Sequence, residues 1–244
     1  MLWYSSPLAA IATLFVSHML VLYPTLRPGS QWLGPVVTSF KTDRKEVWLT
    51  IDDGPSDESL AILDLLDRYH ARATFFVKGT GTAATPERVR AMISRGHQLG
   101  NHSHTHPSGT FWCLPPQRIA REIDGCSRAI VDATGVEAGL FRAPVGMKNP
   151  FVHPLLAERN MKLIGWTARG FDAVATNPEQ SASRILRDVR PGAILLVHEG
   201  HVTESGSMTY RCIEIVLQSL AAQGYDFIIP SVETFEAGAR NVSR

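Results

Sequence analysis

Short apolar runs alternate along the chain with longer segments whose apolar residues have helical spacing. Seven short segments are expected to be strands: 47–51, 73–77, 97–100, 139–142, 161–166, 193–197 and 225–229. The segments between them are expected to be helices: 58–69, 86–95, 116–134, 150–159, 178–189 and 208–223. Run 193–197 is apolar throughout, as in a strand buried on both faces. The pattern therefore predicts an α/β fold, a (β/α) barrel of about seven parallel strands.

The first 45 residues do not follow this alternation. Residues 7–23 are almost wholly apolar, Pro24 ends the run, and no Lys or Arg precedes it as in an ordinary signal peptide. This length is at the lower limit for crossing a bilayer. We expect an apolar helix that anchors the chain in a membrane or lies against the domain or the membrane surface. The division expected is residues 1–45 as this segment and its connection, and 46–244 as one domain.

Charge and composition limit the partners and the location of the chain. The 244 residues are 44% hydrophobic and 19% charged, which suits a globular domain with a large core. A formal net charge of +1 creates no field for nucleic acid, so no nucleic-acid partner is expected. The apolar segment predicts a membrane-associated or cell-envelope protein. If that segment spans, Arg27, Lys41, Arg44 and Lys45 after it favour a cytoplasmic position for the domain.

The first candidate for chemistry is the pair Asp52-Asp53, which follows the strand run 47–51 and precedes Gly54-Pro55. A carboxylate inside a buried strand needs a partner or shifts its pKa. At the carboxyl end of a strand, two adjacent carboxylates can divide the work. One can hold a cation while the other accepts a proton.

A second cluster follows the third strand and contains His102, His104 and His106. His102 and His106 are four residues apart, so one helical turn would put both imidazoles on one face. Together with Asp53 they would complete a metal site that keeps one coordination position open. Zinc fits two imidazoles and one carboxylate best, although Co²⁺ or Ni²⁺ would also fit. His104 would point elsewhere, as an exposed imidazole or one behind the ligands.

Three further positions after strands complete the set of candidates. Arg142 ends the fourth strand, where a buried guanidinium needs a carboxylate such as Asp52. Trp166 and Asp172 follow in the region of the fifth strand, and His198 follows the sixth. A barrel gathers the carboxyl ends of its strands on one face, so these side chains are expected to lie together.

These motifs resemble those of the polysaccharide deacetylases with the NodB homology domain, carbohydrate esterase family 4. The matching motifs are Thr-x-Asp-Asp-Gly-Pro at 50–55, His-Ser-x-x-His at 102–106, Arg-x-Pro-x-Gly at 142–146 and Leu-x-His at 196–198. The resemblance runs from about residue 47 to about residue 229. Four motifs in the family's order make it specific.

The resemblance implies a deformed (β/α) barrel and metal-dependent hydrolysis of an N-acyl group from an amino sugar in an oligo- or polysaccharide, chitin-like or peptidoglycan. It implies these roles: Asp53, His102 and His106 as metal ligands, Asp52 as general base oriented by Arg142, and His198 as general acid tuned by Asp172. The backbone N–H of Val145 would stabilise the oxyanion. Zn²⁺ is the metal expected.

Two departures from the family bear on the substrate rather than on the reaction. Val145 stands where the family usually has an aromatic residue, and Asp172 is followed by Ala173 instead of Trp. Trp166 could supply the missing wall. Two alternatives remain open: a deformylase or deacetylase of a lipid-linked amino sugar, and a catalytically silent carbohydrate-binding relative.

Overall fold

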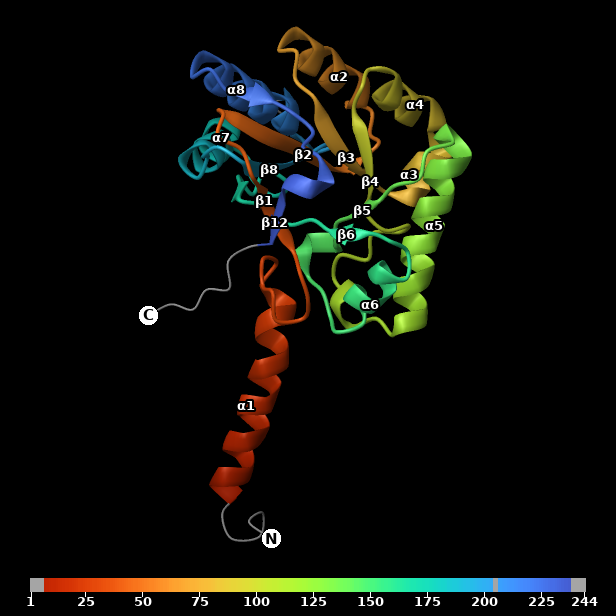
Figure 1. Cartoon of the computed structure of the whole chain (residues 1–244), viewed down its shortest axis with the longest axis vertical. Helices are drawn as coiled ribbons and strands as arrows, with labels where there is room; N and C mark the ends of the chain where they lie inside the picture. The colour runs from red at the N-terminus through yellow and green to blue at the C-terminus, as the bar shows by residue number, and fades with distance from the viewer. Residues whose placement is uncertain (1–6, 204–205, 238–244) are drawn as a thin grey trace.

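A ten-stranded sheet organises the computed structural model, which describes residues 7–203 and 206–237 (Figure 1). The strands follow the order β12-β1-β8-β2-β3-β4-β5-β6, while β11 pairs with β2 and β7 pairs with β8. Their bounds are β1 Val37–Phe40, β2 Glu46–Gly54, β3 Ala73–Val77, β4 Gln98–Asn101, β5 Leu140–Phe141, β6 Lys162–Leu163, β7 Ala168–Arg169, β8 Ala193–His198, β11 Asp226–Phe227 and β12 Phe235–Ala237. A separate hairpin joins β9 Val202–Thr203 to β10 Gly206–Ser207.

The sheet curls into a deformed barrel, as the sequence predicts. All strands except β1 and β12 are joined by parallel pairs. β1 pairs antiparallel with β12 and β8, and Val37 also forms a parallel bridge with Ile164, just beyond β6. This bridge brings the two ends of the sheet together. The boundary expected at residues 45 and 46 therefore falls inside the sheet, between β1 and β2.

Helices cover the outer face of the sheet and form most of the core with it (Figure 1). Around the outside, α7, α8, α2, α4 and α5 follow one another, each in contact with the next. The helix bounds are α1 Pro7–Leu26, α2 Ser59–Arg68, α3 Gly79–Ala84, α4 Pro86–Ser94, α5 Pro116–Thr134, α6 Val152–Ala157, α7 Pro178–Arg187 and α8 Met208–Ala222, with 3₁₀ turns at 111–113, 144–146 and 232–234. Each outer helix is amphipathic, and its apolar stripe meets the sheet.

The alternation of side chains along β2 explains how polar groups reach the interior. Val47, Leu49 and Ile51 belong to the core between the sheet and the outer helices. The intervening Trp48 belongs to a separate cluster on the inner face, because successive side chains of a strand point to opposite faces. Asp52 has the same parity as Trp48. It therefore points into the barrel at the carboxyl end of the strand.

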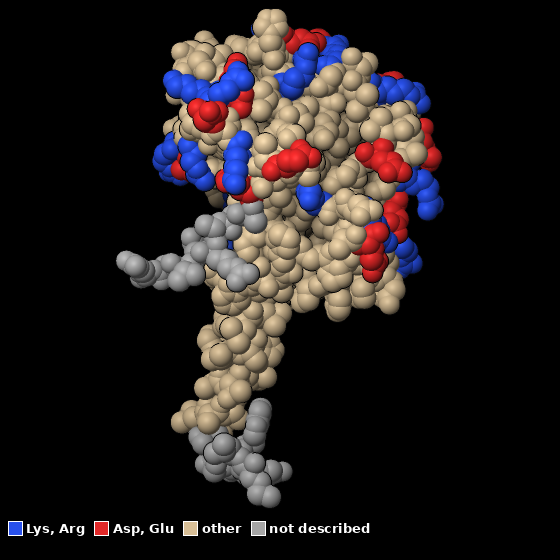
Figure 2. Space-filling view, in the orientation of Figure 1, with Lys and Arg blue, Asp and Glu red and all other residues tan. Residues whose placement is uncertain are grey.

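The apolar helix α1 projects from the domain (Figure 1). Its length and apolar composition are sufficient to cross a membrane, and nearly all its side chains are exposed. In Figure 2 it forms a tan column without charged residues, whereas blue and red residues are interspersed over the visible face of the domain. Only Pro24 and Thr25 of this helix are buried. The end of α1 is thus packed on the domain while the rest extends away from it.

Candidate functional site

The ends of β2 and β8 lie side by side and present the first pair of polar residues. Asp52 is directly opposite His198 in the parallel register of the two strands. Asp52 is buried, and its Oδ1 accepts a hydrogen bond of 2.7 Å from Nη1 of Arg142. The ion pair expected between these two residues is therefore present.

Arg142 is held by a dense set of acceptors although it is fully buried. Its Nη1 also donates to Oγ1 of Thr50 (2.8 Å), its Nη2 donates to the carbonyl of Gly165 (2.9 Å), and its Nε donates to the carbonyl of Ile164 (3.3 Å). A buried charge is tolerated when it is paired and hydrogen-bonded. The arrangement fixes the guanidinium, which in turn fixes the carboxylate of Asp52.

Asp53, His102 and His106 form a group whose ligand atoms all lie within 4.8 Å of one another. The Nε2 atoms of the two imidazoles are 3.1 Å apart, and Nε2 of His106 is 3.6 Å from Oδ1 of Asp53. Nδ1 of His102 is 2.8 Å from the carbonyl of Arg142, so it carries the proton and leaves the Nε2 lone pair free. Imidazole nitrogens and a carboxylate that converge in this way fit a divalent transition metal.

The two imidazoles do not reach this position through a helical turn, so that expectation is wrong. Residues 102–106 are an irregular loop after β4. Ser103 and His106 adopt left-handed backbone conformations (φ 67° and 53°), as does Asp53 (φ 72°). Such conformations are uncommon for residues other than Gly and concentrate at functional sites. The loop, rather than helical spacing, therefore makes the two Nε2 atoms converge.

The electrostatics of the three side chains suit metal binding at neutral pH. Burial would raise the pKa of Asp53, but the nearby His102, His106 and Lys78 hold it below its usual value. Burial, together with His102, lowers the pKa of His106 to about 4. At neutral pH the carboxylate of Asp53 is therefore ionised and the ring of His106 is neutral, as metal ligation requires.

His198 and Asp172 form the second functional pair. The Asp172 side chain is fully buried, and its Oδ2 accepts from the backbone N–H of His198 (2.7 Å). Its Oδ1 lies 3.1 Å from Nδ1 of the same imidazole. Burial disfavours the charged ring, but the hydrogen bond and charge of Asp172 outweigh it and raise the pKa of His198 to about 9. The ring is therefore protonated at neutral pH, and Asp172 orients it.

These groups surround one cavity of about 450 Å³. Asp52, Asp53, His102, His106 and His198 all line it, so the structure brings them together. The aromatic side chains of Trp166 and Phe171 form part of its wall, and Val145 also borders it. Trp166 thus lies where an aromatic wall was expected, and Phe171 is a second aromatic wall that the sequence did not predict.

Val145 places its backbone, rather than its side chain, at the site. It lies in the turn 144–146 with a left-handed conformation (φ 55°), and its side chain is exposed. Among the described residues, no hydrogen-bond acceptor faces its N–H. An unpaired N–H beside the cavity is available to a ligand oxygen.

Sequence reasoning missed three charged residues around the cavity. Nζ of Lys78 is 3.5 Å from Oδ1 of Asp53. Glu199 is buried behind the site, where its Oε2 accepts from Ser56 (2.8 Å) and Ser59 (2.6 Å). Arg169 lines the cavity itself. A clue was available for Lys78 and Glu199, since each lies within two residues of the end of a predicted strand, 73–77 or 193–197.

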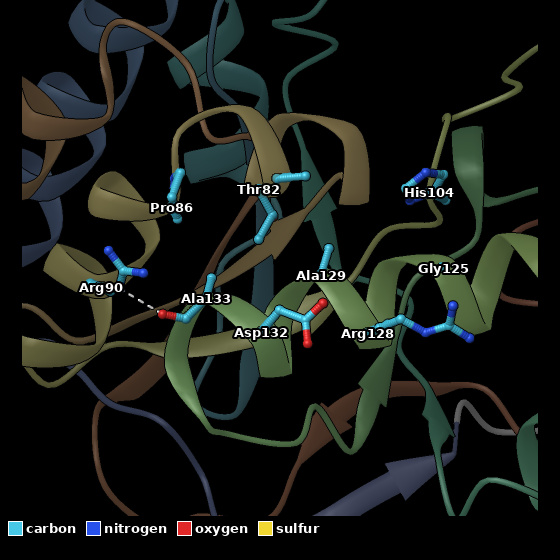
Figure 3. A pocket seen from close by; sticks show the side chains of 10 residues that line it. Thr82, Pro86, Arg90, His104, Gly125, Arg128, Ala129, Asp132 and Ala133 are labelled. Carbon is cyan, nitrogen blue, oxygen red and sulfur yellow. Dashed lines mark hydrogen bonds between the residues drawn. The ribbon is translucent and has the colours of Figure 1, made fainter.

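A second cavity, of about 500 Å³, lies beside α5 and contains none of these residues (Figure 3). His104 lines it and packs against α3 and α5, where a Cβ on Gly79 or Gly125 would collide with the ring. His104 is therefore a half-buried packing residue behind the ligand loop.

The family and its curated members match the chain over most of its length. A family model described as polysaccharide deacetylase matches residues 40–164. A peptidoglycan-N-acetylglucosamine deacetylase of Listeria monocytogenes is 33% identical over 195 residues, which cover 80% of this chain and 40% of that protein. A chitooligosaccharide deacetylase of Bradyrhizobium sp. is 31% identical over 193 residues, which cover 75% of this chain and 87% of that protein. The chain thus spans less than half the length of the Listeria protein.

Solved structures share the fold. A family 4 carbohydrate esterase from Streptomyces lividans in complex with acetate superposes with a TM-score of 0.71 at 29% identity, covering 80% of this chain and 97% of that one. A CE4 family pseudoenzyme from Bacillus anthracis superposes with a TM-score of 0.69 at 27% identity, covering 78% and 65%. Because an enzyme and a pseudoenzyme have this fold, the activity of the chain must be argued from its own residues.

Proposed function

The chain belongs to the polysaccharide deacetylase family, and we propose that it is a metal-dependent hydrolase that removes the N-acetyl group from N-acetylated amino sugars in an oligo- or polysaccharide. The observation that carries this proposal is the complete set of polar groups around one cavity. A carboxylate fixed by a buried guanidinium, three converging ligand side chains and a protonated imidazole all belong to it. A silent carbohydrate-binding relative would need none of these to be complete.

Asp53, His102 and His106 would hold the metal, and Zn²⁺ fits this donor set best. A divalent cation bound there would supply a Lewis acid for the amide carbonyl and for the attacking water. The hydrogen bond from Nδ1 of His102 to the carbonyl of Arg142 fixes that ring for ligation. Arg142 thus supports the ligand His102 through its backbone carbonyl and the base Asp52 through its guanidinium.

The other residues would divide the proton transfers. Asp52 takes a proton from the water as its oxygen attacks the carbonyl carbon. The N–H of Val145 then donates to the oxyanion. His198 donates its proton to the nitrogen as the C–N bond breaks, since an amine anion leaves poorly. The products are acetate and a free amino sugar. Asp172 stabilises the charged form of His198 beforehand.

The substrate proposed is a cell-envelope glycan, because the named relatives act on peptidoglycan and chitooligosaccharides. We propose that α1 anchors the protein in a membrane. The polar side chains of Thr13, Ser17 and His18 bond back to helix carbonyls, so the helix leaves few polar groups unsatisfied in lipid. Deleting residues 1–23, which spares the buried Pro24 and Thr25, should move the protein to the soluble fraction. Unchanged partitioning would refute the anchor.

A second candidate is a deacetylase or deformylase of a lipid-linked amino sugar. The observation that favours it is α1 itself, which would hold the cavity near a bilayer. The basic residues that follow α1 favour a cytoplasmic domain, where polymeric cell-wall glycan is absent. The two candidates share the chemistry and differ in the acyl group and the aglycone.

Release of acetate and formate tests the proposal directly. N-acetylglucosamine oligomers, peptidoglycan fragments and a lipid-linked formamido sugar should each be incubated with added Zn²⁺ and with a chelator. Chelator-sensitive acetate from an oligosaccharide is the expected result, whereas formate would favour the lipid-linked sugar. Asp53→Ala should lose bound metal, and Asp52→Asn should keep metal but lose turnover by at least about a hundredfold. Full activity of Asp52→Asn, or full metal content of Asp53→Ala, would contradict the assignments.

A further inference from the structure

Among the described residues that line the cavity itself, Arg169 is a charged residue that the proposed reaction does not use. It ends the short strand β7 and lies opposite Leu196 of β8 in a parallel register. Leu196 is in turn opposite Thr50 of β2, whose side chain contacts Arg142 inside the barrel. Residues paired in register share a face, so Arg169 points inward as well. Both Arg169 and Leu196 line the catalytic cavity.

Two aromatic rings hold the guanidinium of Arg169. Its Cζ is 3.9 Å from the ring centroid of Phe171 and 5.4 Å from that of Trp166. Phe171 reaches this position through a left-handed backbone conformation (φ 59°), which is uncommon for a bulky residue. Stacking orients a planar guanidinium and leaves the N–H groups at its edge free to donate.

Within the described part of the chain, the guanidinium of Arg169 makes no hydrogen bond or ion pair, and the charge of Asp172 acts on it only from beyond ion-pair distance. The carboxylates of the site are each engaged by another cation: Asp52 by Arg142, Asp53 by Lys78, and Asp172 by His198. Arg169 is also half-buried, and a partly desolvated cation without a partner is unfavourable. An anion that enters the cavity would remove this cost.

We propose that Arg169, stacked on Phe171 and Trp166, binds an anionic substituent of the amino-sugar substrate, a carboxylate or a phosphate. The guanidinium presents paired N–H donors that match either group in two parallel hydrogen bonds. The aromatic rings beside it offer apolar faces to the sugar. This inference rests on the proposed function and narrows its substrate class to acidic amino sugars.

Three tetrasaccharides of equal length test the inference. One is neutral N-acetylglucosamine tetramer, one is the same tetramer with a 1-phosphate, and one alternates N-acetylglucosamine with lactyl-bearing N-acetylmuramic acid. We expect kcat/KM to be at least about tenfold higher for an acidic tetrasaccharide than for the neutral one, the value of a charge-assisted hydrogen bond. The acidic tetrasaccharide with the higher kcat/KM identifies phosphate or carboxylate as the group that Arg169 binds.

Matched variants separate recognition from structure. Arg169→Gln should abolish the preference, and Arg169→Lys should retain part of it because it keeps the charge but loses the fork. Arg121→Gln removes a charge from an exposed position on α5 and should keep the full preference. Equal rates on the neutral and acidic sugars in the wild type would overturn the inference. So would an equal loss on all three in Arg169→Gln, because that would indicate a structural role.

Failure of the proposed function would give a different result from failure of the inference about Arg169. If none of the three sugars releases acetate, the proposed function fails. Calorimetric titrations of both acidic tetrasaccharides, the 1-phosphate tetramer and the one with N-acetylmuramic acid, then decide the inference independently of turnover. Tighter binding by the wild type than by Arg169→Gln would support the anion site, and equal binding would overturn it.

Discussion

Replacing Asp52 and Arg142 singly and together would measure the interaction on which the site is built. The pair is buried, its shortest contact is 2.7 Å, and the guanidinium of Arg142 makes four hydrogen bonds. Arg142→Met removes the cation and all four donors. Asp52→Asn keeps an acceptor of the same shape but removes the negative charge. Neither change replaces one of the three ligand side chains, although Oδ2 of Asp52 lies 3.6 Å from Nε2 of His102.

The magnitudes follow from what each variant leaves buried. Arg142→Met leaves Asp52 as a buried carboxylate without a cation, which costs about 3–5 kcal/mol of unfolding free energy. Asp52→Asn leaves the guanidinium with a neutral acceptor, which costs about 1–3 kcal/mol. In the double variant no charge is buried alone. We therefore expect its loss to be smaller than the sum of the single losses by about 2 kcal/mol.

Urea unfolding of the wild type, the two single variants and the double variant gives the coupling energy between Asp52 and Arg142. A chelator is present to exclude metal binding. An exposed pair provides the control: Nε and Nη2 of Arg159 contact Asp124 at 2.6 and 2.9 Å, with 23% and 47% of the two side chains exposed. Solvent screens that pair, so the same cycle there should give less than about 1 kcal/mol. Additivity at Asp52 and Arg142 would refute the argument that burial makes their ion pair strong.

Three further substitutions test other features of the fold. Burial lowers the pKa of His97 to about 4, and its Nδ1 accepts a backbone hydrogen bond. The stability that this neutral ring contributes above pH 6.5 is therefore lost as pH falls from 6.5 to about 4. His97→Asn keeps an acceptor but does not titrate, so it should remove up to about 3 kcal/mol of that loss, measured as the difference between urea titrations at pH 7 and pH 4.5. Lys148→Met should lower the unfolding free energy by about 1–3 kcal/mol, because two carbonyls at the end of α1 lose their donor; an unchanged urea midpoint would contradict this. A Cβ on Gly54 would lie 1.8 Å from Oε1 of Glu199, whereas one on Gly109 meets nothing within 4 Å. Gly54→Ala should therefore lower the thermal midpoint and Gly109→Ala should not.

The periodicity of the sequence was sufficient to predict the central strands and the outer helices. Run 193–197 is observed as β8 (Ala193–His198), and run 73–77 as β3 with the same limits. These strands are apolar because both faces are buried, so the signal is strong. β2 is longer than expected at its carboxyl end, since it continues through Asp52 and Asp53 to Gly54. A charge ends an apolar run in the sequence, but in the fold the inward charge of Asp52 is paired and the strand continues.

Long-range pairing could not be predicted in the same way. β1 and β12 have few residues. They form strands because they pair with each other, although they lie near opposite ends of the chain. β7 contains only Ala168 and Arg169, too few residues for any period, so Arg169 had no predicted place. The loop 102–106 shows the same limit at the site. The spacing correctly suggested that the imidazoles of His102 and His106 converge, but a left-handed backbone rather than a helix brings them together.

The end of α1 and the wall of the cavity form one packed unit. A Cβ on Gly146, next to Val145, would lie 2.7 Å from Pro28 and 2.5 Å from Trp166. The buried Lys148, two residues later, donates to the carbonyls of Arg27 (3.0 Å) and Pro28 (2.9 Å). The residues that follow α1 therefore rest directly on the turn that presents the Val145 N–H. If α1 anchors the protein as proposed, this packing would also set how the cavity is oriented relative to the membrane surface.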